Sequence, residues 1–208
     1  MTSTISLASQ MLTDPSVNKS PALLNHVSGV IADETKRLRF QVEKVLQMSM
    51  FDRQKTNLKL NDIPVNELVS NVVNTFTLKV EKAGGKIDTD LKAEDDICMI
   101  DEMHFTNVIF NLLDNAVKYR KEDTPLLLKV NTRNIADDKI QITISDNGIG
   151  IKKEDLKRIF EKFYRVSTGN RHDVKGFGLG LAYVHKMITE LKGQIEVTSE
   201  YNKGSDFI

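Results

Sequence analysis

The sequence predicts an α+β protein in which a helical segment precedes a domain of alternating strands and helices. Apolar residues recur at helical spacing through the first 56 residues. After Asn57 short strand patterns alternate with helical ones. Two consecutive strand patterns, Leu126–Asn134 and Lys139–Ser145, are close enough to form a hairpin, so part of the sheet is expected to be antiparallel.

Two helices are predicted in the first 56 residues. Ser3–Thr13 reads as the end of one helix, and Pro21–Thr56 reads as a second, much longer one, with a proline-containing turn between them. A helix of this length needs another helix or another subunit to cover its apolar stripe. The apolar residues at every seventh position are Leu24, Ile31, Leu38 and Val45, with Val27, Val42 and Met48 beside them.

The next five elements begin the second domain. A strand is predicted at Leu58–Ile63, followed by a helix, Pro64–Ala83, that a proline opens and two glycines close. Strands are then predicted at Lys86–Leu91 and Ile97–Ile100. A helix over Glu102–Tyr119 carries most of the polar residues discussed below.

The remaining elements follow the hairpin. A short helix is predicted at Lys153–Phe160, then a polar segment over Arg165–Lys175, and a helix from about Leu179 to Leu191. A strand is expected at Gln194–Ser199. The final residues, Gly204–Ile208, resemble a strand that is cut off as it begins.

Composition excludes several classes of protein. The 208 residues are 40% hydrophobic and 28% charged, which favours an ordinary globular core over disorder. Because 29 basic residues balance 29 acidic ones, a broad nucleic-acid footprint is disfavoured. The single cysteine, Cys98, excludes internal disulfides and thiolate zinc clusters. No apolar run of membrane-spanning length and no signal peptide is present, so we expect a cytoplasmic segment without membrane contact.

One face of the helix after Asp101 could serve a cation and phosphates. Asn111, Asn115 and Lys118 lie at positions i, i+4 and i+7, so two amide oxygens and an ammonium share that face. Magnesium accepts neutral oxygens while it keeps waters and phosphate ligands, and lysine supplies a mobile positive charge. A solvated polar helix face is the alternative interpretation.

Three further segments carry possible chemistry. Asp146–Ile151 ends a strand with two glycines, and its aspartate could accept a hydrogen bond from an exocyclic amine; alone, it could be merely a tight turn. Gly176–Leu181 opens a helix and could direct free backbone amides toward phosphate, although its spacing is not that of a dinucleotide-binding loop. The aromatic residues of Phe160–Arg165 could belong to the core, and its arginine could face solvent.

Together and in this order, the four segments resemble the conserved boxes of sensor histidine kinases of two-component signalling, within the wider GHKL superfamily of gyrase, chaperone, kinase and mismatch-repair ATPases. Asn111–Tyr119 resembles the N box, Asp146–Ile151 the G1 box, Phe160–Arg165 the F box and Gly176–Leu181 the G2 box. The resemblance implies a two-layer α/β sandwich with a mixed, largely antiparallel sheet. Residues 57–208 would be the catalytic ATP-binding domain, with the last strand truncated. Residues 1–56 would be a partial dimerisation and histidine-phosphotransfer hairpin, whose paired copies form a four-helix bundle.

The resemblance also implies ATP and Mg²⁺ as cofactors and assigns roles to residues. Asn115 would be the magnesium ligand, with Asn111 close to the metal and phosphates. Lys118 would contact phosphate, and Tyr119 the ribose or adenine. The adenine pocket would be formed by Asp146, which accepts from the amino group, together with Gly148, Gly150 and Ile151.

A mobile lid over about Val166–Lys175 is implied as well. Arg165 would stabilise charge on the γ-phosphoryl group during transfer, with Asn111 and Lys118 contributing to catalysis. The residues implied to bind ATP at the end of the lid and the start of the next helix are Lys175, Gly176, Phe177, Gly178, Leu179, Gly180 and Leu181.

One departure from the family is clear. The family's phosphoacceptor lies in a His-Glu-x-x-Thr-Pro segment, and the sequence contains no such segment. None of the four histidines, His26, His104, His172 and His185, has those neighbours, so each is interpreted as a packing or surface residue. Residues 3–8 resemble the sequence that follows the acceptor, so the chain is expected to be truncated just after it.

The sequence therefore predicts the kinase core of a sensor histidine kinase that binds Mg-ATP but cannot phosphorylate itself. In the whole protein, phosphate would pass to the acceptor histidine and then to an aspartate of a response-regulator receiver domain. A homodimer through the helical hairpin is expected, and membrane anchoring of the whole protein stays open. The alternatives are a GHKL-type ATPase clamp and a nucleotide-sensing dimerisation module without kinase activity.

Overall fold

The structure, a computed structural model, describes residues 2–13, 20–35, 57–135, 138–166 and 178–208. The chain divides into two compact units, Met1–Lys55 and Thr56–Ile208.

The described part of the first unit is helical. Helix α1 spans Thr2–Met11, and residues 21–35 form a second helical segment. Ala8 and Val27 are both buried and pack together, with Leu12, Val30 and Ile31 against them. Helix formation at 21–35 agrees with the sequence pattern, whereas residues 36–56 of the predicted long helix, with Leu38, Val42, Val45 and Met48, lie outside the described residues.

The second unit is built on a five-stranded mixed sheet in the order β2-β4-β5-β7-β6. Within the described residues, β2 and β4 pair in parallel, and the other neighbouring strands of this sheet are antiparallel. A separate antiparallel ribbon pairs β1 with β3. The strands are β1 (Asn61–Pro64), β2 (Lys86–Leu91), β3 (Ile97–Ile100), β4 (Leu127–Ile135), β5 (Lys139–Asp146), β6 (Val197–Glu200) and β7 (Gly204–Phe207).

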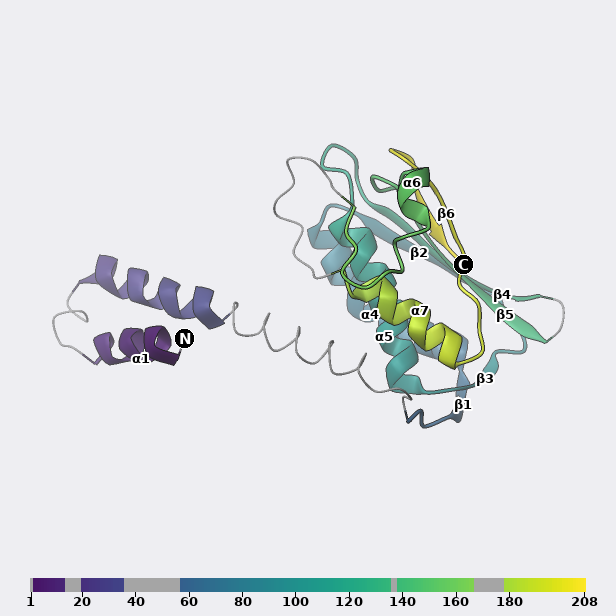
Figure 1. The fold of residues 1–208 in the computed structure, drawn as a ribbon, viewed down its shortest axis with the longest axis horizontal. Helices are drawn as coiled ribbons and strands as arrows, with labels where there is room; N and C mark the ends of the chain where they lie inside the picture. Colours follow the sequence, from purple (N-terminus) through teal and green to yellow (C-terminus); the bar gives the residue numbers. More distant parts are fainter. Residues whose placement is uncertain (1, 14–19, 36–56, 136–137, 167–177) are drawn as a thin grey trace. The chain divides into compact units, whose positions relative to one another are not determined.

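Three helices cover one face of this sheet, namely α4 (Val65–Lys82), α5 (Glu102–Lys118) and α7 (Gly180–Glu190). Figure 1 shows them side by side, with α5 next to both α4 and α7. The short helix α6 (Lys153–Leu156) lies beside β6 instead. The arrangement is a two-layer α/β sandwich, as predicted.

Alternating burial along β4 explains why there are two layers. Leu128, Val130 and Thr132 are at most 1% exposed, whereas the intervening side chains are more accessible. The buried face of the sheet packs against the apolar side of the helices, where Val69, Phe76 and other side chains are also buried. Because side chains alternate across a strand, one face of the sheet is packed and the other faces solvent.

Helix α5 is fixed at both ends, and it positions the polar face described below. Asp101 caps its start by accepting a hydrogen bond from the backbone N–H of His104 at 2.9 Å. The same carboxylate accepts from the backbone N–H of Lys59 at 2.7 Å. Tyr119 ends the helix, one residue after the last helical position, Lys118.

Most predicted elements are present, but three boundaries were wrong. The first strand begins at Asn61 instead of Leu58, because only the later residues pair with β3. The strand predicted at Gln194–Ser199 is shifted to Val197–Glu200, where it pairs with β7. The helix predicted over Lys153–Phe160 ends at Leu156, since the chain continues in tight turns in which Asp155 O accepts from the amides of Arg158 and Ile159.

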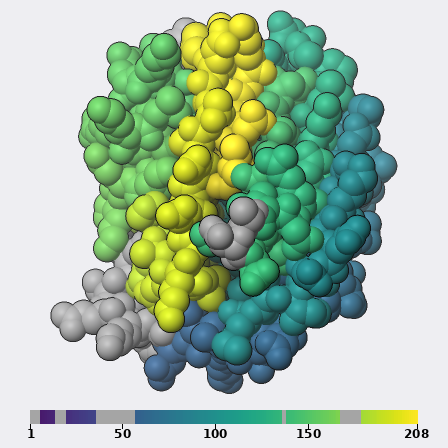
Figure 2. All heavy atoms as spheres, turned by 90° about the vertical axis from the view of Figure 1, so that its right-hand side faces the viewer, coloured from purple at the N-terminus to yellow at the C-terminus, as the bar shows by residue number. Residues whose placement is uncertain are grey.

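Residues Gly204–Phe207 form a strand within the five-stranded sheet. β7 lies between β5 and β6, and its Ser205 is paired with Asp146 at the end of β5. Figure 2 shows the C-terminal strands in yellow, with the green segment around α6 on one side and the teal hairpin strands on the other. A segment of four residues at the end of the chain therefore supports the central strand that leads into the candidate site.

Candidate nucleotide site

The polar face of α5 contributes amide groups at the predicted positions. Asn111 donates from Nδ2 to the backbone oxygen of Asn107 at 2.7 Å, which leaves its Oδ1 for another partner. Asn115, one turn later, is half-buried, and no hydrogen bond of its side chain occurs within the described parts of the chain. Both amides could therefore offer an oxygen to a cation or a donor to phosphate.

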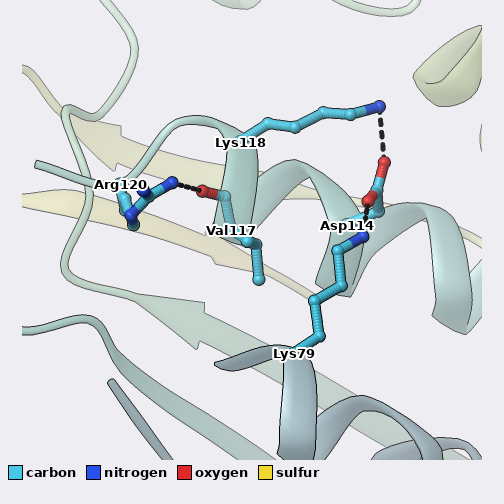
Figure 3. A network of polar contacts seen from close by, with 5 residues as sticks. All are labelled: Lys79, Asp114, Val117, Lys118 and Arg120. Carbon is cyan, nitrogen blue, oxygen red and sulfur yellow. Dashed lines mark hydrogen bonds and ion pairs between the residues drawn. The ribbon is translucent and has the colours of Figure 1, made fainter. Parts of the chain in front are cut away.

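Lys118, the third residue of this face, is engaged by a neighbour that the sequence analysis did not select. Its Nζ lies 2.5 Å from Oδ2 of Asp114, one turn earlier on α5. Oδ1 of the same carboxylate binds Lys79, which comes from α4 (Figure 3). Burial raises the pKa of Asp114, but the hydrogen bonds and charges of Lys118 and Lys79 outweigh it, and the pKa is lowered overall.

The turn after β5 is tied to the end of α5. The backbone N–H of Ile149 donates to the carbonyl oxygen of Tyr119 at 2.9 Å. Gly148 is buried between the two segments, and a Cβ at this position would lie 2.6 Å from the same carbonyl oxygen. Glycine is therefore required for the close approach of the turn to the end of α5.

Asp146 lies at the end of β5 in a half-buried position. Its Oδ1 accepts a hydrogen bond from the backbone N–H of Gly148 at 2.7 Å. Burial raises its pKa to about 6, and the nearby Asp206 carboxylate adds to the rise, whereas the amides of Gly148 and Ser205 and the charge of Lys121 oppose it. The sequence analysis did not identify Asp206 or Ser205, because only the pairing of β7 with β5 brings them to Asp146.

A serine cluster fixes the far side of the same turn. Ser199 Oγ accepts from the backbone N–H of Ile151 at 2.8 Å, lies 2.8 Å from the carbonyl oxygen of Gly204 and 2.9 Å from Ser205 Oγ. Gly150 has a φ of +64°, and a Cβ there would lie 2.1 Å from the carbonyl oxygen of Glu200. The predicted base-pocket residues Gly150 and Ile151 are thus held by the turn between β6 and β7.

The start of α7 lies against α5. A Cβ on Gly180 would be 2.9 Å from Oδ1 of Asn111, so this glycine allows the close approach. Leu179 is buried, Leu181 is half-buried, and Gly178 has a φ of +69°. The predicted N-box and G2-box residues are therefore neighbours. Gly176 and Phe177 of the G2 segment lie outside the described residues, as does the predicted lid from residue 167 to Lys175.

The aromatic segment connects to both parts of the site. The backbone N–H of Phe163 donates to the carbonyl oxygen of Gly178 at 2.9 Å. Arg165 forms a hydrogen bond with the Tyr119 side chain; burial raises the pKa of Tyr119, and the arginine opposes that rise. Arg165, predicted to act on the γ-phosphoryl group, thus lies next to the residue predicted to contact the nucleoside.

Of the three histidines that the structure describes, one is buried and two are exposed. His104 is buried, and its Nδ1 lies 2.8 Å from the Tyr183 hydroxyl. His185 is exposed, and its ring lies tilted against the Phe160 ring, with the centroids 5.2 Å apart. His26 is exposed on the first unit. His172 falls outside the described residues. Cys98 is half-buried, and burial, together with the charge of Asp96, raises its pKa.

The amide oxygens on α5 fit a magnesium ion that is carried by a phosphate ligand. No group of three or more His, Cys, Asp or Glu residues able to hold a metal ion occurs in the described ranges. The neutral oxygens of Asn111 and Asn115 would share the ion with waters and phosphate oxygens.

Among the described helices, none combines the length and apolar character needed to cross a membrane.

A two-layer sandwich with a glycine-containing turn after its central strand, next to an amide-bearing helix, defines a nucleotide-binding domain of the α+β class. The family model of the histidine kinase-, DNA gyrase B- and HSP90-like ATPases matches residues 100–208. The chain belongs to this family of ATPases.

Relatives of known name are sensor kinases. The sensor protein RprX of Bacteroides fragilis (strain YCH46) is 64% identical over 206 residues, which cover 99% of this chain and 40% of RprX. The signal transduction histidine-protein kinase ArlS of Staphylococcus aureus (strain USA300) is 30% identical over 189 residues, or 91% of this chain and 41% of ArlS. The chain thus spans about two fifths of the length of these relatives.

Solved structures share the fold. Full-length ShkA in complex with AMPPNP has a TM-score of 0.76 at 21% identity, over 90% of this chain and 38% of ShkA. The histidine kinase ThkA in complex with the response regulator TrrA has a TM-score of 0.66 at 22% identity, over 98% of this chain and 56% of the matched chain. These similarities confirm the predicted GHKL-type fold.

Proposed function

We propose that this chain is the ATP-binding kinase core of a sensor histidine kinase, and that it uses Mg-ATP as the phosphoryl donor. One observation carries the proposal: the end of α5, the turn after β5, the aromatic segment and the start of α7 converge on one another through Tyr119, Asn111 and Gly178. If the four segments had unrelated roles, there would be no reason for them to contact one another. Homology to RprX and ArlS supports the same activity.

The residues divide the work of binding. Asp146 accepts a hydrogen bond from the adenine amino group, and Gly148, Gly150 and Ile151 shape the pocket for the flat base. Tyr119 contacts the ribose or adenine. Asn115 and Asn111 present oxygens to the magnesium ion and the phosphates, and Lys118 contacts phosphate.

Catalysis by these residues consists of positioning and charge neutralisation. Arg165 stabilises the charge that develops on the γ-phosphoryl group, while Asn111 and Lys118 hold the phosphates in line for transfer. Magnesium, when bound, neutralises phosphate charge. The backbone amides at the start of α7, together with Lys175, Gly176 and Phe177, complete the phosphate site.

The partners follow from this role. The acceptor histidine lies on the first helix of a dimerisation domain, and phosphate then passes to an aspartate of a response-regulator receiver domain. The similarity in fold to ThkA, solved with the response regulator TrrA, supports such a partner. The chain forms a homodimer through its helical hairpin and acts in the cytoplasm.

Calorimetry with two variants tests the nucleotide assignment. Asn115→Ala removes the metal ligand, so it is expected to weaken Mg-ATP binding by about tenfold or more while affecting metal-free ATP little. Asp146→Asn is expected to weaken both forms, because a hydrogen-bond acceptor for the amine is lost or reversed. Asn71→Ala, on an exposed position of α4, is the control. Equal, small losses for both variants, with and without magnesium, would contradict the assignment.

A further inference from the structure

Asp114 is placed between two lysines from different helices. It is 16% exposed, and each of its oxygens contacts one ammonium group, that of Lys118 on α5 or that of Lys79 on α4. Figure 3 shows the carboxylate between the two side chains, which reach it from different directions. Both of the carboxylate's oxygens are therefore used by positive charge before any ligand arrives.

The two lysines are not held equally. Lys79 lies over the ring of Phe76, 4.8 Å from its centroid, and 5.9 Å from the centroid of Phe110. These two rings pack edge to face at 4.8 Å, so they form a fixed surface for the ammonium. Lys118 is in the last turn of α5, and its side chain is 38% exposed, against 48% for Lys79, so the aromatic contacts and not exposure distinguish the two lysines. Lys118 is the lysine that can leave the carboxylate without losing an aromatic contact.

We propose that Asp114 is a positioning residue that holds the Lys118 ammonium until nucleotide phosphate takes it over, and that Lys79 then remains to neutralise the carboxylate. This inference rests on the proposed phosphate contact of Lys118. Asp114 and phosphate compete for one cation, so the ion pair lowers the affinity for ATP. Lys79 reduces the cost of the exchange, because Asp114 is not left unpaired when Lys118 moves.

The size of the effect follows from the exposure of the pair. Ion pairs between partly exposed side chains are weak, so removal of the competing carboxylate is expected to change the affinity only severalfold. Asp114→Asn should therefore tighten Mg-ATP binding by about threefold. Lys79→Met should weaken it by about threefold, because Asp114 then depends on Lys118 alone. Adenosine, which has no phosphate, should bind all variants equally well.

The experiment is titration calorimetry of the 208-residue chain with Mg-ATP and with adenosine. The decisive comparison is a double-mutant cycle: in a Lys118→Met background, Asp114→Asn is expected to have no effect on Mg-ATP. Tighter binding that persists in that background would overturn the proposal, since it would reflect a general loss of negative charge. Glu102→Gln, which removes an exposed carboxylate at the opposite end of α5, is the matched control.

The outcomes separate this inference from the proposed function. Mg-ATP binding that Lys118→Met weakens but Asp114→Asn leaves unchanged would overturn the inference alone. Failure of the parent chain to bind Mg-ATP, or no effect of Lys118→Met, would overturn both the inference and the phosphate contact. If thermal unfolding shows that Asp114→Asn does not fold, Lys79→Met tests the same competition, and wild-type affinity for Mg-ATP in that variant would overturn it.

Discussion

At the scale of single residues, Asp146 has the strongest consequences for pH dependence. Burial raises its pKa to about 6, and Asp206 contributes further. The ionised carboxylate only accepts hydrogen bonds, whereas the protonated form carries an O–H that would compete with the adenine amine. In the proposed site, recognition of the base is therefore coupled to a carboxyl group whose pKa is about 6.

We expect the affinity for ATP to fall by about tenfold per unit as the pH decreases below about 6. Calorimetry between pH 5 and pH 8 measures this profile. Asp206→Asn is expected to lower the pKa of Asp146 and so to move the fall to lower pH. A flat profile across this range would show that Asp146 is not the adenine acceptor.

The raised pKa of Asp146 also affects the stability of the fold. Low pH favours folding, whereas it weakens the expected ATP binding. Because the pKa of Asp146 is about 6 in the folded chain and 3.8 as its ordinary value, the folded state binds more protons between these values. Its contribution therefore favours folding at low pH and declines by roughly 3 kcal/mol as the pH rises through this window. Urea unfolding of Asp146→Asn should lack this component, whereas an unchanged pH dependence would argue against the shift.

At the scale of elements, the turn after β5 depends on the strand pair β6–β7. Gly150 and Gly84 both have a positive φ, but a Cβ on Gly150 would meet the carbonyl oxygen of Glu200 at 2.1 Å, and Gly84 has open space. The two glycines separate the cost of backbone conformation from the cost of steric overlap.

Gly84→Ala is expected to cost about 1 kcal/mol of unfolding free energy and to leave ATP affinity unchanged. Gly150→Ala should cost several kcal/mol, roughly, and should weaken ATP binding by displacing the turn. Chemical denaturation and calorimetry on both variants provide the comparison. Equal losses of unfolding free energy in the two variants would mean that the turn after β5 can move away from β6 and β7 without cost.

Hydrogen bonds made by one side chain connect the same elements. Ser199→Ala removes the hydroxyl that accepts from the backbone N–H of Ile151, so this half-buried amide loses its hydrogen-bond partner. We expect a loss of about 1 to 3 kcal/mol in the unfolding free energy. Thr198→Ala, one residue earlier and exposed, is the control. Wild-type stability of the Ser199 variant would show that water replaces the hydroxyl without cost.

At the scale of the whole molecule, the helical hairpin is predicted to dimerise. Leu24 occupies a position of the seven-residue repeat and is 37% exposed in the single chain, so a lysine there need not disturb the packing of Ala8 with Val27. In a dimer seam the charge would be costly. Leu24→Lys should therefore shift sedimentation from dimer toward monomer, and exposed Ser28→Lys should not. A monomeric parent chain at high concentration would rule out the bundle.

The whole chain is also predicted to bind ATP without phosphorylating itself, because it contains no His-Glu-x-x-Thr-Pro segment. Incubation with radiolabelled ATP should leave no acid-labile phosphate on the protein. A separate domain carrying that segment should restore transfer, and Arg165→Ala should then slow transfer more than it weakens ATP binding. Robust self-phosphorylation that is lost on changing His26 would identify a different acceptor.

The sequence by itself was sufficient for the fold class and for most elements, because periodicity and helix-end residues are local signals. The alternation in β4 and β5, the capping Asp101 and the glycines after α4 can all be interpreted without a structure. The order of the four polar segments also predicted the family. Local signals did not predict where the strands that begin at Asn61 and Val197 start, because their pairing partners lie in other segments of the chain.

Only the tertiary structure decided which side chains surround the predicted site residues. Asp206 and Ser205 reach Asp146 through the pairing of β7 with β5, and Lys79 reaches Asp114 across two helices. The (i, i+4) spacing of Asp114 and Lys118 was visible in the sequence, but the second lysine was not. Motifs therefore predicted which groups carry the chemistry, whereas long-range packing set their pKa values and their competing partners. Electrostatic interactions depend on distance in space and on burial rather than on position along the chain.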